Sequence, residues 1–185
     1  MLMAMARRHR DSAAGAFHVT AHSVWSAELF RDDVDRQGFV ELLAQTVERY
    51  EWACLGLCLL TTHYHVLLET KDATLPAGMQ ELNFRHAARF NARHRLRGHV
   101  FAGRYASRRM ETDSHLLTAF RYVARNPIEA GLVSTPIAWR WSTYASAVGL
   151  DTSFSFVDAS RVINYFGRPR RAAVERLRLF VESPW

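Results

Sequence analysis

The chain has 185 residues, of which 49% are hydrophobic and 12% aromatic, a composition that excludes a disordered protein and fits one domain with its own core. Its formal net charge of +6 favours a polyanionic partner. Lys71 is the only lysine among the 24 basic residues, and arginine suits nucleic acid because its guanidinium contacts phosphate in a planar, bidentate way. The alternative explanation for the many arginines is genome composition, since arginine codons are GC-rich.

Residues 1–14 are expected to form a flexible basic arm. The arm carries Arg7 and Arg8, and no apolar run follows them, so it lacks the form of a secretory signal. No stretch of the sequence approaches the roughly 18 apolar residues that are needed to span a bilayer. We therefore expect a protein without membrane contact, located in the cytoplasm and associated with the nucleoid.

Hydrophobic patterns define a main domain over 15–149 and a mostly helical tail over 150–185. In chain order, the expected elements are a strand over 16–22, a helix over 33–50, strands over 52–60 and 63–70, a helix over 75–93, a strand over 104–111 and a helix over 113–125. Pro127 is expected to end the last helix or to start another after a break. The order β-α-β-β-α-β-α predicts an α+β fold, a ferredoxin-like sandwich with a central antiparallel sheet.

Cys54 and Cys58 lie in the apolar strand expected over 52–60. Their C-x-x-x-C spacing fits neither a redox pair nor a zinc knuckle. Side chains four positions apart on a regular strand share one face, so both thiols are expected to be buried, inert and on the same side of the sheet.

His63-Tyr64-His65 opens the strand expected over 63–70. Because side chains alternate across a strand, both imidazoles project from one face, with Cα atoms about 7 Å apart, and could hold one divalent cation. Tyr64 turns to the opposite face, toward the core. A single H-x-H is not specific, and a pair of half-exposed strand histidines is the alternative.

Tyr122 and Asn126 are four residues apart, so on a helix they share one face. A tyrosine beside a bound metal can attack phosphorus, but a phenol ionises only well above neutral pH and needs the metal or a base. The carbonyl oxygen of Asn126 is a plausible third ligand for a hard cation. The alternative interpretations are that Tyr122 is an ordinary core residue and that Asn126, before Pro127, only marks the end of the helix.

The stretch from Arg85 to Arg109 combines arginines with aromatic residues. Arg85, Arg89 and Arg93 repeat every four residues along one expected helix. Further arginines follow through the loop and the next strand, among them Arg104 and Arg108. Interleaved aromatics suit single-stranded or hairpin DNA, in which bases can stack while phosphates need cations. A solvated basic face is the alternative.

A competing motif is the H-x-T formed by His18 and Thr20 on the first strand. Two-histidine phosphoesterases carry a pair of such motifs. The second is missing here, because the other strand motif has histidine, His65, where threonine or serine is required.

Six segments in the same order resemble the single-tyrosine HUH transposases, in particular the REP-associated tyrosine transposase branch. They are GAFHVT at 15–20, HYHVLLET at 63–70, GMQELNFRHAARFN at 78–91, GHVFAGRY at 98–105, RYVARNPIEAGLV at 121–133 and WRWSTYASAVG at 139–149. Any one segment is weak evidence for the family, whereas all six in this order are specific to it and cover most of residues 15–149. The resemblance implies the HUH endonuclease fold.

The resemblance also implies roles for the matching residues. His63 and His65 would be metal ligands, Asn126 the third ligand, and Tyr122 the nucleophile that cuts DNA and leaves a 5′-phosphotyrosine. The cofactor would be Mg²⁺ or Mn²⁺, and the partner a single strand carrying an imperfect, palindrome-like hairpin. The protein would act as a monomer or a homodimer, with Tyr122 serving its own site or a partner's. The expected DNA-binding residues are Arg7, Arg8, Arg85, Arg89, Arg93, Arg104 and Arg108.

Three departures or open points accompany the resemblance. Thr61-Thr62 stands where relatives commonly have Pro-Asn, and a retired transposase that binds repeat DNA without cutting is therefore the alternative function. Arg125, between the nucleophile and the third ligand, is expected to add charge near the site. Trp139, Trp141 and Tyr144 are expected to anchor the tail by packing, with base stacking as the alternative.

Overall fold

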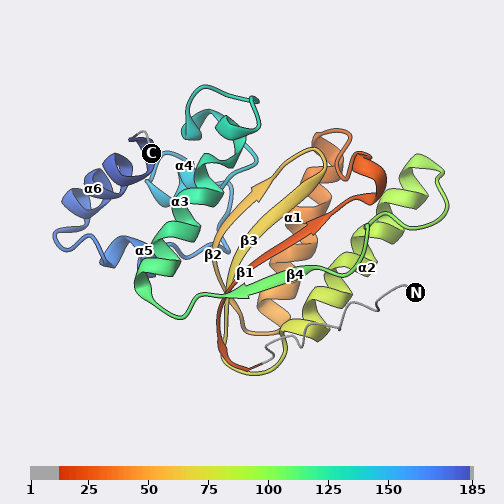
Figure 1. Cartoon of the computed structure of the whole chain (residues 1–185), viewed down its shortest axis with the longest axis horizontal. Coiled ribbons are helices and arrows are strands. Elements are labelled where there is room, and N and C mark those ends of the chain that lie inside the picture. The colour runs from red at the N-terminus through yellow and green to blue at the C-terminus, as the bar shows by residue number, and fades with distance from the viewer. Residues whose placement is uncertain (1–12, 184–185) are drawn as a thin grey trace, which may run out of the picture.

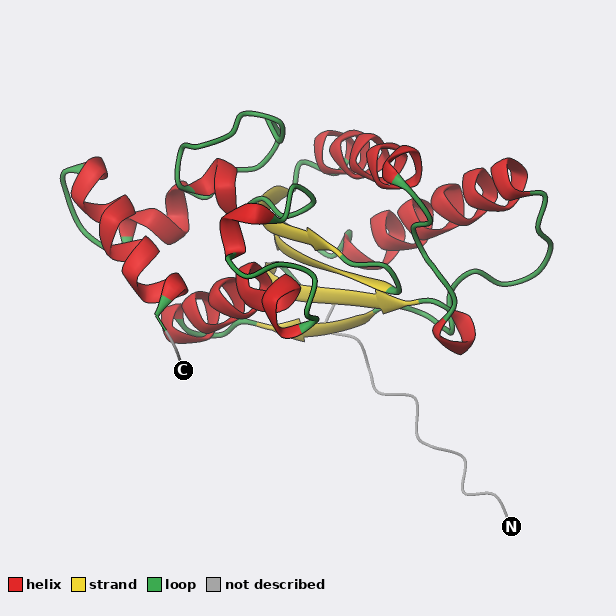
Figure 2. Cartoon of the chain, turned by 90° about the horizontal axis from the view of Figure 1, so that it is seen from above, coloured by secondary structure: helices red, strands yellow, loops and turns green. Residues whose placement is uncertain are grey.

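The computed structural model describes residues 13–183, which form a four-stranded antiparallel sheet between two layers of helices (Figures 1 and 2). The strands are β1 (Gly15–His22), β2 (Ala53–Leu59), β3 (His63–Thr70) and β4 (Ala106–Arg109). The helices are α1 (Asp33–Arg49), α2 (Leu75–His94), α3 (Asp113–Glu129), α4 (Tyr144–Ala147), α5 (Ser160–Asn164) and α6 (Arg170–Glu182), with short 3-10 turns at Val24–Ser26 and Pro136–Ala138. None of the described helices is long and apolar enough to cross a membrane.

The strands lie in the order β2-β3-β1-β4, with α1 joining β1 to β2 and α2 joining β3 to β4. This is the split β-α-β arrangement of a ferredoxin-like sandwich, so the expected fold class is confirmed. The two central strands pair along their whole length, from Gly15 opposite Thr70 to His22 opposite His63. Thr61 and Thr62 form the tight turn between β2 and β3, closed by a hydrogen bond from Leu60 N to His63 O of 2.9 Å.

Each face of the sheet has its own apolar core because side chains alternate along the strands. Phe17 and Val19 of β1 and Tyr64 and Val66 of β3 pack against α1 and α2 on one face. The other face packs against α3 and α5, on which α6 packs in turn, and Leu67 of β3 belongs to this second core. The even-numbered positions of β1 and the odd-numbered positions of β3 therefore lie on the α3 face.

Helix α3 begins at the expected residue but ends later than expected. Thr112 caps its start, because the Thr112 hydroxyl accepts a hydrogen bond from His115 N. The helix does not stop at Arg125 but continues through Pro127 to Glu129. Pro127 has no N–H to donate, so one bond of the helix is lost, but Ala130 N donates to Asn126 O (2.9 Å) and Leu132 N to Pro127 O (2.9 Å) beyond it.

The cysteines lie on opposite faces of the sheet, so the expectation that they share one face is wrong. A register shift between Cys54 and Gly56 inserts one extra residue into β2. Cys54 thus packs in the core under α1 and α2, whereas Cys58 packs in the core under α3. Both thiols are buried and free, and burial raises the pKa of Cys54 to about 12, so the expectation of inert thiols is confirmed.

The tail packs onto the α3 face of the domain. Val162, Ala173, Leu177 and Val181 are fully buried in the same core as α3. Arg125 of α3 donates hydrogen bonds to the carbonyl oxygens of Val181 (2.9 Å) and Ser183 (3.0 Å) at the end of α6. Arg125 therefore holds the tail against α3 and, contrary to expectation, directs its charge to α6 and not into the site.

The other expected tail anchors are confirmed as packing residues. Trp141 and Tyr144 are buried, and Trp141 Nε1 donates to Asp33 Oδ1 of α1 (2.9 Å). Trp139 Nε1 donates to the carbonyl oxygen of Leu59 in β2 (2.9 Å). These bonds fix the segment after α3 to both halves of the domain. The expected basic arm over 1–14 lies almost entirely outside the described residues.

Candidate active site

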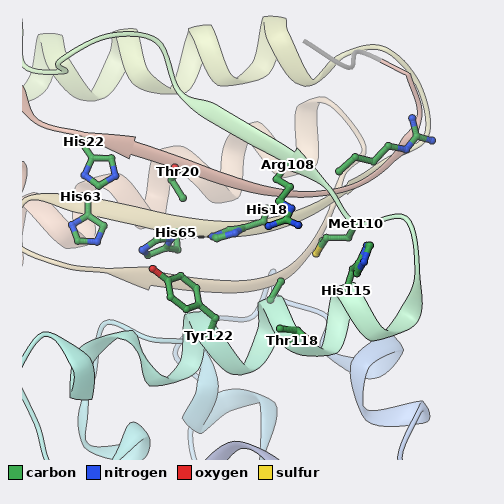
Figure 3. A pocket seen from close by; sticks show the side chains of 12 residues that line it. His18, Thr20, His22, His63, His65, Arg108, Met110, His115, Thr118 and Tyr122 are labelled. Carbon is green, nitrogen blue, oxygen red and sulfur yellow. Dashed lines mark hydrogen bonds between the residues drawn. The ribbon is translucent and has the colours of Figure 1, made fainter. Parts of the chain in front are cut away.

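A pocket of about 560 Å³ lies between the α3 face of the sheet and helix α3 (Figure 3). Its lining comes from β1, β3, the end of β4 and the first half of α3. The lining residues are His18, Thr20, His22, His63, His65, Arg108, Arg109, Met110, His115, Thr118, Ala119 and Tyr122. Histidines and arginines dominate this set, and it contains no carboxylate, so the described lining suits an anion.

His63 and His65 project into the pocket from the start of β3, as the strand alternation predicts. Their ring centroids are 5.0 Å apart, and the rings are nearly perpendicular. His63 also stacks on His22 of β1, with ring centroids 4.6 Å apart. The two expected metal ligands thus share one face of the sheet beside a third histidine.

Burial keeps these imidazoles neutral. His65 is only 4% exposed, and burial, together with the neighbouring histidines, lowers its pKa to about 2. Burial also lowers the pKa of His63, with a smaller contribution from His22. Neutral imidazole is the form that binds a metal, so neither ring has to lose a proton at neutral pH before it can act as a ligand.

Tyr122 reaches the pocket from the middle of α3, and its hydroxyl points toward His63 and His65 in Figure 3. Its ring meets the rings of His65 and His18 edge to face, with centroids 5.3 Å and 5.9 Å away. Tyr122 is 38% exposed, although its ring contacts His65, which is buried, and His18, which is half-buried. The phenol is therefore both held in place and accessible to a ligand.

Asn126 lies one helical turn after Tyr122 and is buried, with 6% exposure. Its side chain forms a hydrogen bond with His63, which brings the amide next to the histidine pair. Asn126 does not line the pocket itself and is connected to it through this interaction with His63. The four residues expected to form the site therefore converge, although they come from two elements far apart in sequence.

A divalent cation fits this residue set in one specific respect. Nε2 of His65 is buried and has no hydrogen-bond partner in the described part of the chain. Such an atom is costly unless something binds it, and a neutral imidazole nitrogen is a common metal ligand. Within residues 13–183, no group of three His, Cys, Asp or Glu side chains is arranged to hold a metal. A third protein ligand would thus have to be of another type, such as the amide of Asn126.

The expected DNA-binding arginines fall into three groups. Arg108 lies opposite His18 in the β1–β4 pairing and lines the pocket, whereas Arg104 is exposed in the loop before β4. Arg7 and Arg8 lie outside the described residues. The third group, the α2 stripe, consists of Arg85, Arg89 and Arg93.

The α2 stripe lies on the opposite face of the sheet from the pocket, and its charges are paired. Arg89 contacts Glu41 of α1 at 3.1 Å, and Arg93 contacts Asp32 and Asp35 at 2.7 and 2.6 Å. Arg85 contacts Glu81 at 3.5 Å. The contacts of Arg89 and Arg93 hold α2 against α1, whereas the Arg85–Glu81 pair lies within α2. All of these pairs reduce the charge that the stripe offers to a polyanion.

His18 and His22 are site residues that the metal-site pattern alone did not identify. Both face the pocket because His18, Thr20 and His22 occupy alternate positions of β1. His18 Nε2 lies 2.9 Å from His65 Nδ1. The alternation of β1 was the available signal, but only the β1–β3 register reveals which strand lies beside the histidine pair.

Comparisons with known proteins identify the family and the fold. The family model described as "Transposase IS200 like" matches residues 15–126. The structure of a REP-associated tyrosine transposase bound to a REP hairpin aligns with a TM-score of 0.67 and 15% identity, over 79% of this chain and 86% of that chain. A candidate transposase from Deinococcus radiodurans R1 aligns with a TM-score of 0.45 and 14% identity, over 71% of this chain and 100% of that chain. No curated protein matches the sequence.

Proposed function

The chain belongs to the family of IS200-like transposases, and we propose that it is a metal-dependent HUH endonuclease that cuts and rejoins single-stranded DNA through Tyr122. Family membership makes the protein a transposase acting on DNA. The metal, the nucleophile and the covalent intermediate are the proposal. The observation that carries it is the convergence of His63, His65 and Tyr122 on one pocket without a carboxylate in its described lining.

Tyr122 is the best nucleophile that this pocket offers. The other hydroxyl groups in the lining belong to Thr20 and Thr118, and an alcohol is far less acidic than a phenol. The position on a long helix with a buried apolar stripe gives Tyr122 a rigid support. Its exposure leaves the hydroxyl free to approach a phosphate.

Mg²⁺ or Mn²⁺ is the cofactor that we assign to the site, with His63, His65 and Asn126 as its protein ligands. The unpaired Nε2 of His65 and the hydrogen bond between Asn126 and His63 support this set. When bound, such a cation would polarise the scissile phosphate and stabilise the charge that develops on it. Histidine and amide ligands are neutral, so the cation would keep its full charge for the phosphate.

The proposed reaction exchanges one phosphate ester for another. The Tyr122 oxygen attacks phosphorus, the bond from phosphorus to O3′ breaks, the phenolic proton passes to solvent, and the departing O3′ takes up a proton. The products are a 5′-phosphotyrosine and a free 3′-hydroxyl. A different 3′-hydroxyl then reverses the step and rejoins the DNA. Because the ester bond is conserved throughout, the protein needs no ATP.

We infer that the substrate is a single strand that carries a hairpin. The structural neighbour with the same fold is bound to a REP hairpin, and this chain offers basic residues where a strand would enter the pocket. Arg108 lies at the pocket, and Arg104 is exposed in the loop before the same strand. Guanidinium groups in this position are suited to the phosphates on either side of the scissile one.

The test uses an oligonucleotide pool with a fixed hairpin and randomised flanks, labelled at either the 5′ or the 3′ end. After incubation with Mn²⁺, we expect the 3′ label to migrate with the protein on a denaturing gel and the 5′ label to appear on a shorter free strand. Tyr122→Phe and added chelator should both abolish the adduct. Tyr165→Phe is the matched control, because Tyr165 is 39% exposed and does not line the pocket.

Two outcomes would contradict the proposal. One is an adduct that persists unchanged in Tyr122→Phe. The other is tight, salt-sensitive hairpin binding without any adduct, which would identify the protein as the DNA-binding module described above.

A further inference from the structure

The two proposed metal histidines are each contacted at Nδ1 by a neighbouring side chain. His63 Nδ1 lies 3.1 Å from Thr62 Oγ1. His65 Nδ1 lies 2.9 Å from His18 Nε2, a contact that Figure 3 marks with a dashed line. Thr62 is the adjacent residue in the sequence, whereas His18 reaches its partner across the β1–β3 pairing from 47 positions away. The contact is diagonal, since Thr20 and not His18 lies directly opposite His65.

The His18–His65 contact requires one proton between the two facing nitrogens. Either His65 Nδ1 carries it and His18 Nε2 accepts, or His18 Nε2 carries it and His65 Nδ1 accepts. A neutral imidazole has one N–H, so the first arrangement leaves a lone pair on His65 Nε2. The second leaves a buried N–H there without a partner in the described chain. Only the first arrangement produces a nitrogen that can bind a cation.

We propose that His18 is a positioning residue for the metal site: its Nε2 accepts the Nδ1 proton of His65, which fixes the tautomer and ring orientation that direct His65 Nε2 at the cation. The inference rests on the proposed function in assigning a metal to His65. The histidine of the H-x-T motif thereby gains a role that needs no second motif. Hydrogen bonds of this kind to metal-bound histidines commonly change metal affinity 10- to 100-fold.

The tautomer can be measured without metal or DNA. In protein labelled with ¹⁵N-histidine, two-bond proton–nitrogen correlations distinguish a ring protonated at Nδ1 from one protonated at Nε2. We expect His65 in the wild-type protein to be protonated at Nδ1. A His65 ring protonated at Nε2 would overturn the inference whether or not the protein cuts DNA.

Substitutions at His18 provide the second measurement. His18→Gln places an amide oxygen near the position of Nε2 and can still accept the proton, whereas His18→Leu fills the space without an acceptor. We expect the dissociation constant for Mn²⁺, measured by electron paramagnetic resonance, to rise 10- to 100-fold in His18→Leu and to stay within about threefold of wild type in His18→Gln. The control is His99→Ala, which removes an exposed histidine outside the pocket.

The outcomes separate this inference from the proposed function. Mn²⁺ affinity that is equal in wild type and His18→Leu, or equally weak in His18→Gln and His18→Leu, contradicts the role of His18. Failure of the wild-type protein to bind Mn²⁺ at all contradicts the metal in the proposed function, and the tautomer measurement then still decides the hydrogen bond. If His18→Leu does not fold, the tautomer of His65 decides the inference.

Discussion

Replacing Asn126 with alanine should remove most of the stabilisation that a metal gives to this protein. Asn126 is 6% exposed and hydrogen-bonds to His63. Its amide therefore holds one proposed metal ligand, His63, in place and is itself another proposed ligand. Without metal, Asn126→Ala loses one net hydrogen bond, about 1 kcal/mol. For a chain of this length that corresponds to a fall in Tm of about 2–4 °C.

The larger effect appears when Mn²⁺ is present. At a concentration 100 times its dissociation constant, Mn²⁺ would stabilise the wild-type protein by about 2.7 kcal/mol and raise its Tm by about 5–11 °C. If loss of Asn126 weakens binding about 100-fold, the same concentration gives only about 0.4 kcal/mol, a rise of about 1 °C. Thermal unfolding followed by circular dichroism, with Mn²⁺ and with chelator, measures both quantities.

The control for this prediction is Asn164→Ala, which truncates an exposed asparagine at the end of α5. That variant should keep the full wild-type shift with Mn²⁺. The reasoning is refuted if Asn126→Ala retains the wild-type Mn²⁺ shift, because the amide would then take no part in holding the cation.

Three further predictions concern other parts of the molecule. Burial lowers the pKa of His86 to about 4. Below pH 6.5 the unfolded chain therefore binds a proton at this residue that the folded chain does not bind, and the free energy of unfolding falls. Between pH 6.5 and pH 4, the free energy of unfolding measured in urea should fall by about 3 kcal/mol less in His86→Gln than in wild type. Arg125→Ala should lower the Tm by about 4–8 °C, because α6 loses two hydrogen bonds to α3 worth about 1 kcal/mol each. Arg108→Ala should weaken hairpin binding and reduce its log–log salt slope by about 1, whereas Arg89→Ala, already paired with Glu41, should change the slope little.

Each of these has a contradicting result. Equal acid sensitivity of wild type and His86→Gln would show that the carbonyl oxygen of Leu29 and the charge of Asp35, which both raise the pKa of His86, offset its burial. An unchanged Tm in Arg125→Ala would show that the contact between Arg125 and α6 does not stabilise the folded protein. A larger salt effect for Arg89→Ala than for Arg108→Ala would favour DNA binding on the α2 face, as the sequence pattern alone suggested.

The site was predictable to the extent that it depends on local periodicity. Alternation along a strand places His63 and His65 on one face, and the four-residue spacing on a helix places Tyr122 and Asn126 together. Neither rule says that the strand and the helix meet. The resemblance to a known family predicted that meeting, and the packing of α3 on β2 and β3 provides it.

What the sequence could not predict arises from tertiary contacts. A single inserted residue near Gly56 reverses the side on which Cys54 lies, and hydrophobic alternation cannot locate such a bulge inside a wholly apolar strand. The arginine stripe of α2 has the spacing of a binding surface, but α1 supplies carboxylates that pair with it. Arg125 illustrates the same point, because its carbonyl partners lie more than 50 residues away.

The most direct test of the account is to identify the amino acid that becomes attached to DNA. The covalent product would be digested with nuclease and trypsin, and the remaining nucleotide located by mass spectrometry. We predict a nucleotide joined through its 5′-phosphate to the oxygen of Tyr122, in the segment of α3 that faces His63 and His65. A nucleotide on any other residue, or one joined through its 3′-phosphate, would contradict the claim that these three side chains form one catalytic site.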